Sequence, residues 1–144
     1  MRITLVILFL FSISVNTFSN RRIQFEDKRV VLVTSVECGY CITNIAFFNQ
    51  LSEEYKDQVQ MVALSESSLK KINKLPRIYP DREVVLKNWI VVPNARKLYK
   101  KLIEYETFPQ LIFIDNGIVV DRFVGTIESV KNEIRTQLPL FIKE

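Results

Sequence analysis

Histidine is absent from this chain of 144 residues. Its absence excludes catalysis by a histidine general acid or base, metal sites with histidine ligands, and covalent haem attachment through a C-x-x-C-H motif. Glycine and proline are scarce, at 3 and 5 residues, which argues against a fibrous protein. The excess of basic over acidic residues, 20 against 16, is small and scattered, so the sequence does not predict a nucleic-acid-binding surface.

The rest of the composition is that of an ordinary globular protein. Apolar residues make up 48% of the chain and charged residues 25%. A chain of this length predicts a single domain.

The N-terminal residues have the pattern of an export signal. After Met1 and Arg2, residues 3–15 form an apolar run that is shorter than the roughly 20 residues of a membrane-spanning helix. The run has the length of a signal-peptide core, and the small residues Thr17 and Ser19 suit cleavage after Ser19. The sequence therefore predicts a signal peptide at 1–19 and a mature domain at 20–144 in the periplasm or another extracytoplasmic compartment. An uncleaved anchor or a buried strand is the alternative for the same run.

Strand and helix patterns alternate along the mature chain, which predicts an α/β fold. The Asn116-Gly117 pair predicts a type I′ hairpin turn, because both positions of that turn need positive φ. The fold predicted is a mixed central sheet with helices on both faces and a C-terminal β-hairpin plus helix. Strands are expected at 30–34, 59–64, 84–92, 110–115 and 118–124, and helices at 41–55, 66–75, 95–105 and 126–138.

Two cysteines, Cys38 and Cys41, directly follow the first strand. The first thiol of such a pair is suited to attack a disulfide, and the second to resolve the mixed disulfide that forms. Three alternatives stay open: a structural disulfide, half of a metal site shared with a second chain, and two inert core thiols. The first of these would stabilise little, since closing a four-residue loop is worth only about 2 kcal/mol.

Two segments resemble the thioredoxin-like superfamily. One is the strand–CGYC–helix segment at 30–55, and the other is Thr107-Phe108-Pro109 followed by a strand, a hairpin and a last helix. The resemblance covers residues 23–138. It is strongest to exported thiol:disulfide oxidoreductases related to cytochrome-maturation reductants, whose extra strand–helix insertion residues 66–93 could supply. The CGYC tetrapeptide is also similar to that of periplasmic disulfide isomerases.

The resemblance implies an extracytoplasmic thiol:disulfide oxidoreductase that acts on protein thiols. It implies that Cys38 attacks and Cys41 resolves, that Pro109 follows a cis peptide bond, and that Phe108, Pro109 and Tyr40 bind the substrate. It implies no cofactor and no metal, and a membrane redox partner that recycles the protein. A monomer is expected, because the short stretch between 19 and the first strand is too small for a dimerisation domain. The alternative is a non-catalytic thioredoxin-fold module that binds a peptide or scaffolds an assembly, with an incidental disulfide.

Four positions depart from the family pattern. Glu37 replaces a tryptophan before the first cysteine, and Tyr40 replaces a common proline before the second. Leu32 lies near the position of a buried acid in thioredoxin, and Asn44 near that of a glutamate in cytochrome-maturation reductants. We expect the Glu37 carboxylate to oppose ionisation of Cys38 by charge repulsion. The sequence does not determine whether the protein oxidises, reduces or isomerises its clients.

Overall fold

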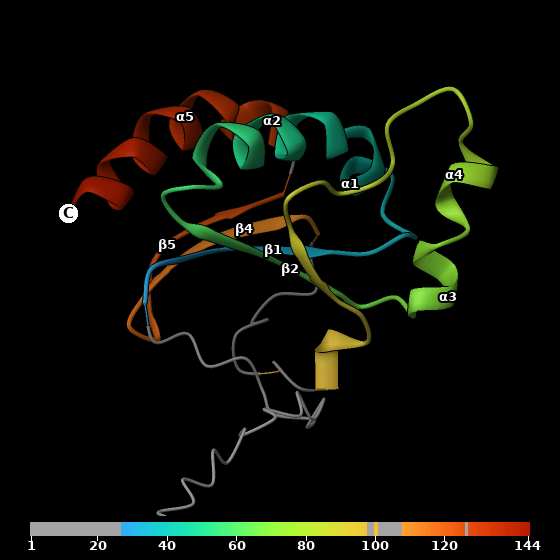
Figure 1. Cartoon of the computed structure of the whole chain (residues 1–144), viewed down its shortest axis with the longest axis horizontal. Coiled ribbons are helices and arrows are strands. Elements are labelled where there is room, and N and C mark those ends of the chain that lie inside the picture. The colour runs from blue at the N-terminus through green and yellow to red at the C-terminus, as the bar shows by residue number, and fades with distance from the viewer. Residues whose placement is uncertain (1–26, 98–99, 101–107, 126) are drawn as a thin grey trace, which may run out of the picture.

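The computed structural model describes residues 27–97, 100, 108–125 and 127–144. Within them, five strands form one mixed sheet in the order β3-β2-β1-β4-β5 (Figure 1). β1, β2 and β3 are parallel, β4 is antiparallel to β1, and β5 is antiparallel to β4. The strands are β1 (Arg29–Thr34), β2 (Gln60–Ser65), β3 (Ile90–Val92), β4 (Gln110–Asp115) and β5 (Ile118–Val124).

The central strand β1 is buried on both sides, as its unbroken β-branched run predicted. Val30 and Leu32 face the layer formed by α2 (Ile45–Tyr55) and α5 (Ile127–Lys143), which cover one face of the sheet (Figure 1). Val31 and Val33 face the other side, where the core includes Val62, Leu64, Ala95, Ile112 and Ile114. The predicted mixed α/β sheet is therefore confirmed.

The second face carries η1 (Ala95–Lys97), a 3-10 helix whose Ala95 is buried against the sheet. A helix was predicted here at 95–105. Residues 98–99 and 101–107 lie outside the described part of the chain, so the rest of that prediction is not tested.

The single helix predicted at 41–55 is wrong, because the chain breaks it into α1 (Gly39–Thr43) and α2. Asn44 separates the two helices with a non-helical ψ of 6°. Its side-chain Nδ2 donates to the Tyr40 carbonyl at 2.8 Å. Asparagine commonly competes in this way for backbone groups that a continuous helix would use.

The helix predicted at 66–75 is also wrong, since two short helices, α3 (Leu69–Ile72) and α4 (Leu75–Ile78), occupy the region. Ser68, within the predicted helix, caps α3 through a bond from the Lys71 amide. Pro76, which directly follows the predicted helix, lies in the first turn of α4, where a missing N–H costs no hydrogen bond.

The strand predicted at 84–92 shrinks to Ile90–Val92. Side chains of α2 bind the preceding backbone instead: Asn49 accepts from the Lys87 amide and donates to the Val85 carbonyl, and Ser52 donates to the Lys87 carbonyl. These polar groups thus find partners on a helix rather than in a sheet ladder.

The C-terminal hairpin and helix are confirmed in type, with one boundary corrected. Asn116 and Gly117 both have positive φ, as a type I′ turn requires. α5 was expected to end before Pro139, yet it continues to Lys143 with the proline inside it. Phe141, beyond the proline, is buried and stacks on Phe113 with ring centroids 4.9 Å apart. The expected cap, Thr126, lies outside the described residues.

No helix in the described part of the chain is both long and apolar enough to cross a membrane. The apolar run at 3–15 and the predicted signal peptide lie outside that part.

Candidate active site

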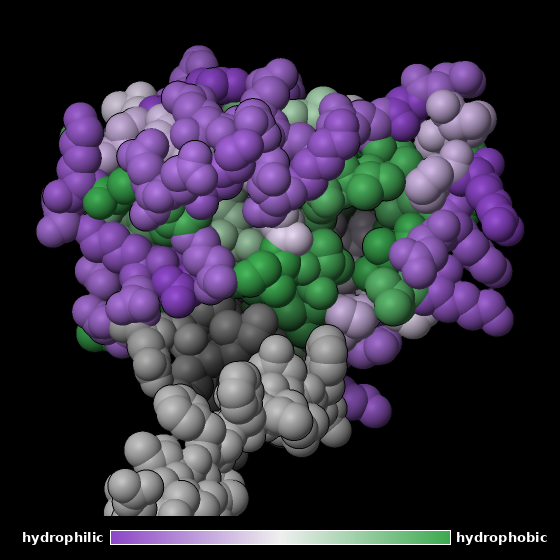
Figure 2. All heavy atoms as spheres, in the orientation of Figure 1, coloured by the Kyte–Doolittle hydropathy of each residue, from purple (hydrophilic) through white to green (hydrophobic). Residues whose placement is uncertain are grey.

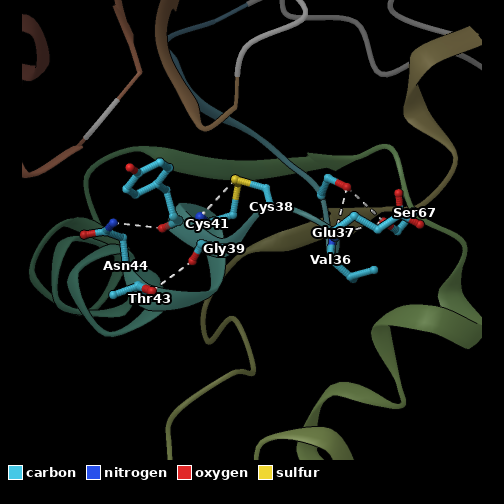
Figure 3. The surroundings of a disulfide bond; sticks show 10 residues. Val36, Glu37, Cys38, Gly39, Cys41, Thr43, Asn44 and Ser67 are labelled. Atoms are coloured by element: carbon cyan, nitrogen blue, oxygen red, sulfur yellow. Dashed lines mark hydrogen bonds between the residues drawn. A yellow bond between two sulfur atoms is a disulfide. The ribbon is translucent and has the colours of Figure 1, made fainter.

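The cysteine pair lies at the carboxyl end of β1, the central strand, where the chain turns into α1 (Figure 3). Cys38 occupies the N-cap position of α1 with an extended backbone. Its Sγ accepts a hydrogen bond from the Cys41 amide at 3.1 Å. Because α1 is a single short turn, this direct N–H contact, rather than a long helix dipole, is the local support for charge on Cys38.

Cys38 and Cys41 form a disulfide, with Cα atoms 5.2 Å apart. That separation is within the normal range for disulfides. The two sulfur-bearing residues differ in exposure, since Cys41 is 0% exposed and Cys38 is partly exposed. An incoming thiol or disulfide can therefore approach Cys38 but not Cys41.

Two serines from separate segments hold the loop before Cys38. The Ser67 hydroxyl accepts from the Val36 amide at 3.0 Å, and the Ser35 hydroxyl accepts from the Glu37 amide at 3.2 Å (Figure 3). The two hydroxyl oxygens lie 3.4 Å apart and share a hydrogen bond. The sequence analysis did not find this support, because Ser67 follows β2 and meets the loop only through tertiary structure.

A small depression of about 290 Å³ surrounds the partly exposed sulfur, and we call it the active-site depression. It is lined by Ser35, Glu37, Cys38, Glu66 and Phe108. Glu66, which was not predicted from the sequence, is a mostly buried carboxylate whose Oε1 lies 2.7 Å from a guanidinium nitrogen of Arg96. No motif distinguishes Glu66 from other surface acids, and only the pairing of β1 with β2 brings it beside Cys38.

Of the three residues predicted to bind the substrate, one lines the active-site depression, one is buried and one is exposed outside it. Phe108 lines the active-site depression with Cys38. The Phe108–Pro109 peptide bond is cis, as the resemblance implied, and Pro109 is buried at the start of β4, next to the end of β1. Tyr40 is 60% exposed and does not line the depression.

Glu37 does not stand alone before Cys38. Its carboxylate pairs with Lys71 of α3, with Oε1 and Nζ 2.5 Å apart. The hydrogen bond and the charge of Lys71 lower the pKa of Glu37. The lysine therefore offsets the negative charge that was expected to oppose ionisation of Cys38. Lys71 lies 34 residues after Glu37, so the sequence gives no signal of the pairing.

Leu32, which lies near the position of a buried acid in thioredoxin, is an apolar residue buried in the core. Across the described residues, no three His, Cys, Asp or Glu side chains converge as a metal site would require. The site therefore consists of one partly exposed sulfur, one buried sulfur and a shallow depression. This arrangement is suited to thiol–disulfide exchange.

Solved structures with the same architecture are thiol:disulfide interchange proteins and thioredoxins. A Chlorobium tepidum protein named thiol:disulfide interchange protein DsbE superposes with a TM-score of 0.64 at 20% identity, covering 83% of this chain and 82% of that chain. The pneumococcal exposed lipoprotein thioredoxin Etrx1 from Streptococcus pneumoniae strain TIGR4 has a TM-score of 0.53 at 18% identity, covering 76% and 87%. The dsbF protein of MTB, solved in mixed oxidized and reduced forms, has a TM-score of 0.57 at 14% identity, covering 77% and 81%.

No protein-family model and no curated protein matches the chain. At these identities the likeness concerns the fold, which is thioredoxin-like, as the sequence predicted.

Proposed function

We propose that this protein is an extracytoplasmic thiol:disulfide oxidoreductase that exchanges disulfides with protein thiols. The observation that carries the proposal is the asymmetry of the cysteine pair. Cys38 is partly exposed and accepts a hydrogen bond from the Cys41 amide, whereas Cys41 is fully buried. A thioredoxin-like fold supports the same activity, since its solved neighbours carry names of that class.

In the reducing direction the Cys38 thiolate attacks one sulfur of a client disulfide. A bond forms between Cys38 and that sulfur, while the other client sulfur leaves as a thiolate and takes a proton from water. The Cys41 thiol then loses its proton and attacks the Cys38 sulfur. The internal disulfide forms, the second client sulfur leaves, and two electrons have passed from the pair to the client. The same steps in reverse oxidise a client dithiol.

Several residues act on Cys38 without reacting. The Cys41 amide stabilises the attacking thiolate by donating to its sulfur, since hydrogen bonds to charged acceptors are stronger than neutral ones. Phe108 borders the depression in which the client sulfur would sit, and the buried Pro109 follows it directly before β4. Tyr40 is exposed beside the pair and would contact the client from outside the depression.

The same proposal includes where the protein acts and which redox partner recycles it. The signal-like pattern of residues 1–19 supports export, and one structural neighbour is named an exposed lipoprotein. An exported protein whose pair is consumed in each turnover needs a redox partner, and a membrane protein would connect it to electrons from inside the cell. We expect a monomer that needs no cofactor and no metal.

Insulin reduction by dithiothreitol, together with trapping of mixed disulfides, tests the activity. We expect the wild type to accelerate insulin precipitation, and the variant carrying both Cys38→Ser and Cys41→Ser to match the uncatalysed rate. Reduced Cys41→Ser should accumulate mixed disulfides on non-reducing gels with client proteins that carry disulfides, because the resolving thiol is gone, and Cys38→Ser should not.

Equal trapping by Cys38→Ser would show that the attacking residue is wrongly assigned. A wild type no faster than the double variant would instead favour a binding module whose disulfide is incidental.

A further inference from the structure

A second hollow of about 360 Å³ borders the active-site loop, and we call it the apolar pocket. Its walls come from three places in the chain. Val36, Ile42 and Ile45 lie around the cysteine pair, Leu69 and Ile72 belong to α3, and Val85 lies in the segment that follows α4. Figure 2 shows a hollow among hydrophobic side chains between the body of the molecule and the region of α3 and α4.

The apolar pocket is open rather than an internal packing defect. Ile42 and Ile45 at its base are buried, whereas Leu69 and Val85 are 53% and 52% exposed. A hollow of this size with mostly apolar walls and a few polar groups is typical of a binding site. Half-exposed apolar side chains at the opening gain stability when an apolar partner covers them.

The apolar pocket adjoins the reactive sulfur. Ser35 lines both the apolar pocket and the active-site depression that contains Cys38. Val36 precedes Cys38 by two residues, and Ile42 directly follows Cys41. In Figure 3 the Val36 side chain lies on the side of the loop that faces α3 and α4. A polypeptide bound at Cys38 thus reaches the apolar pocket within a few extended residues, each of which spans about 3.4 Å.

The wall of the apolar pocket that α3 and α4 form is basic. Residues 69–78, which include α3 and α4, contain Lys70, Lys71, Lys74 and Arg77 and no carboxylate. All four cations are exposed, and Lys71 is paired with Glu37. The facing segment before Val85 carries Asp81, Arg82 and Glu83, of which Glu83 pairs with Lys87, so the excess of positive charge lies on the wall of α3 and α4. Such a wall attracts acidic groups, and the attraction weakens as salt screens it.

We propose that the apolar pocket is a client-binding subsite that takes a bulky apolar side chain, flanked by acidic residues, from a polypeptide whose reactive cysteine lies a few residues away. The inference rests on the proposed function, because it assigns a client class to that same site. A polypeptide, rather than a free amphiphile, suits a pocket that shares Ser35 with the reactive depression. Binding in the pocket holds the client sulfur at Cys38 and raises the rate of attack.

Synthetic peptides joined through one cysteine to thionitrobenzoate test the subsite. The peptides carry phenylalanine at each of two to five residues on either side of the cysteine, flanked by aspartates, lysines or serines. Release of the yellow thiol from each peptide gives a rate constant for the reduced protein. We expect the best-placed phenylalanine–aspartate peptide to react at least tenfold faster than its serine-for-phenylalanine counterpart. Lysine flanks should slow it several-fold at low salt, and high salt should shrink that difference.

The variant Val85→Trp fills the opening of the apolar pocket, and Ile78→Trp is its matched control, since Ile78 is 59% exposed and does not line the pocket. For each variant the rate constant with the phenylalanine–aspartate peptide is divided by the rate constant with glutathione disulfide. We expect Val85→Trp to lower this ratio to about the value that the serine peptide gives with the wild type. Ile78→Trp should leave the ratio unchanged. Should Val85→Trp fail to fold, the wild type can be titrated with the same peptide carrying serine in place of its cysteine, and the changes in backbone amide chemical shift followed by NMR. These changes should be largest around Val36, Ile72 and Val85.

The outcomes separate the two proposals. A wild type that does not react with glutathione disulfide contradicts the proposed function itself. A wild type that reacts with glutathione disulfide but treats all peptides alike, or a Val85→Trp variant that keeps the preference, overturns the subsite alone. Binding of free dodecanoate at the pocket without any fall in peptide rates would likewise overturn it, by assigning the pocket to small amphiphiles.

Discussion

The role proposed for Cys38 depends on the contacts of a few individual residues. Cys41 contributes an amide hydrogen bond and a buried sulfur, and Ser35 and Ser67 fix the loop that precedes Cys38. The cysteines could be identified from sequence, because a C-x-x-C pair after a buried strand is a local pattern. Ser67 and Lys71 could not, because each reaches the site only after β2 and α3 are placed beside β1.

The Glu37–Lys71 pair makes the pH at which Cys38 ionises sensitive to two surface charges. Glu37→Gln removes the negative charge next to Cys38 and leaves the positive charge of Lys71, so the pH midpoint of thiolate absorbance near 240 nm should fall. Removing the cation with Lys71→Gln leaves Glu37 uncompensated, so the midpoint should rise. Each change is expected to be about a few tenths of a pH unit at low salt, since the groups are exposed and screened.

The double variant Glu37→Gln, Lys71→Gln is the control for this pair. It should return close to the wild-type midpoint, because both charges are gone. Two single variants that both leave the midpoint unchanged at low salt would mean that neither charge acts on Cys38.

At the scale of elements, the strands and the hairpin follow closely from the sequence. A β-branched run predicts β1, apolar runs predict β2 and β4, and Asn116-Gly117 predicts the turn before β5. The errors lie where side chains compete with backbone hydrogen bonding: Asn44 divides α1 from α2, and Asn49 and Ser52 keep residues 84–89 out of the sheet. The contacts of Asn49 and Ser52 join positions more than 30 residues apart, which periodicity within one segment does not reveal. The Asn44 contact is local, but apolar spacing does not indicate where a side chain will bond the backbone.

Asn49 connects α2 to the segment that forms one wall of the apolar pocket. Its side chain bonds Glu83, the Val85 carbonyl and the Lys87 amide at 2.7 to 2.8 Å, and Asn49 is buried. Asn49→Ala leaves two backbone groups without partners, so it should lower the free energy of unfolding by about 2 to 3 kcal/mol. Urea denaturation of the oxidised protein measures the change.

Gln50→Ala serves as the control for Asn49, because Gln50 lies next to it on the same helix and is exposed. Its effect should stay within about 0.5 kcal/mol. If Asn49→Ala costs no more than Gln50→Ala, the hydrogen bonds to residues 83–87 do not hold this segment in place.

At the scale of the whole molecule, one sheet positions everything the proposed chemistry needs. β1 leads to Cys38 at the carboxyl end of the central strand, and β4 follows directly after Phe108 and Pro109. β2 leads into the insert that carries Lys71 and one wall of the apolar pocket. The sequence analysis predicted this arrangement for the cysteines and for Pro109 through the thioredoxin-like resemblance. It did not predict the pocket, because the path of residues 66–89 depends on packing against α1 and α2 rather than on a local pattern.

At the scale of the whole molecule we also expect residues 1–19 to direct export and to be removed after Ser19. Expressed in a bacterium with a periplasm, the full chain should appear in the osmotic-shock fraction with Asn20 as its first residue. There its two cysteines should be oxidised, because disulfides persist in that compartment.

Leu8→Arg places a charge inside the apolar run, which costs about 3 kcal/mol in membrane insertion, so this variant should stay in the cytoplasm with the cysteines reduced. Arg22→Leu, beyond the cleavage point, should be exported like the wild type. Recovery of the wild-type chain in the membrane fraction with residues 1–19 still attached would identify the run as an anchor, and recovery in the cytoplasm would contradict export.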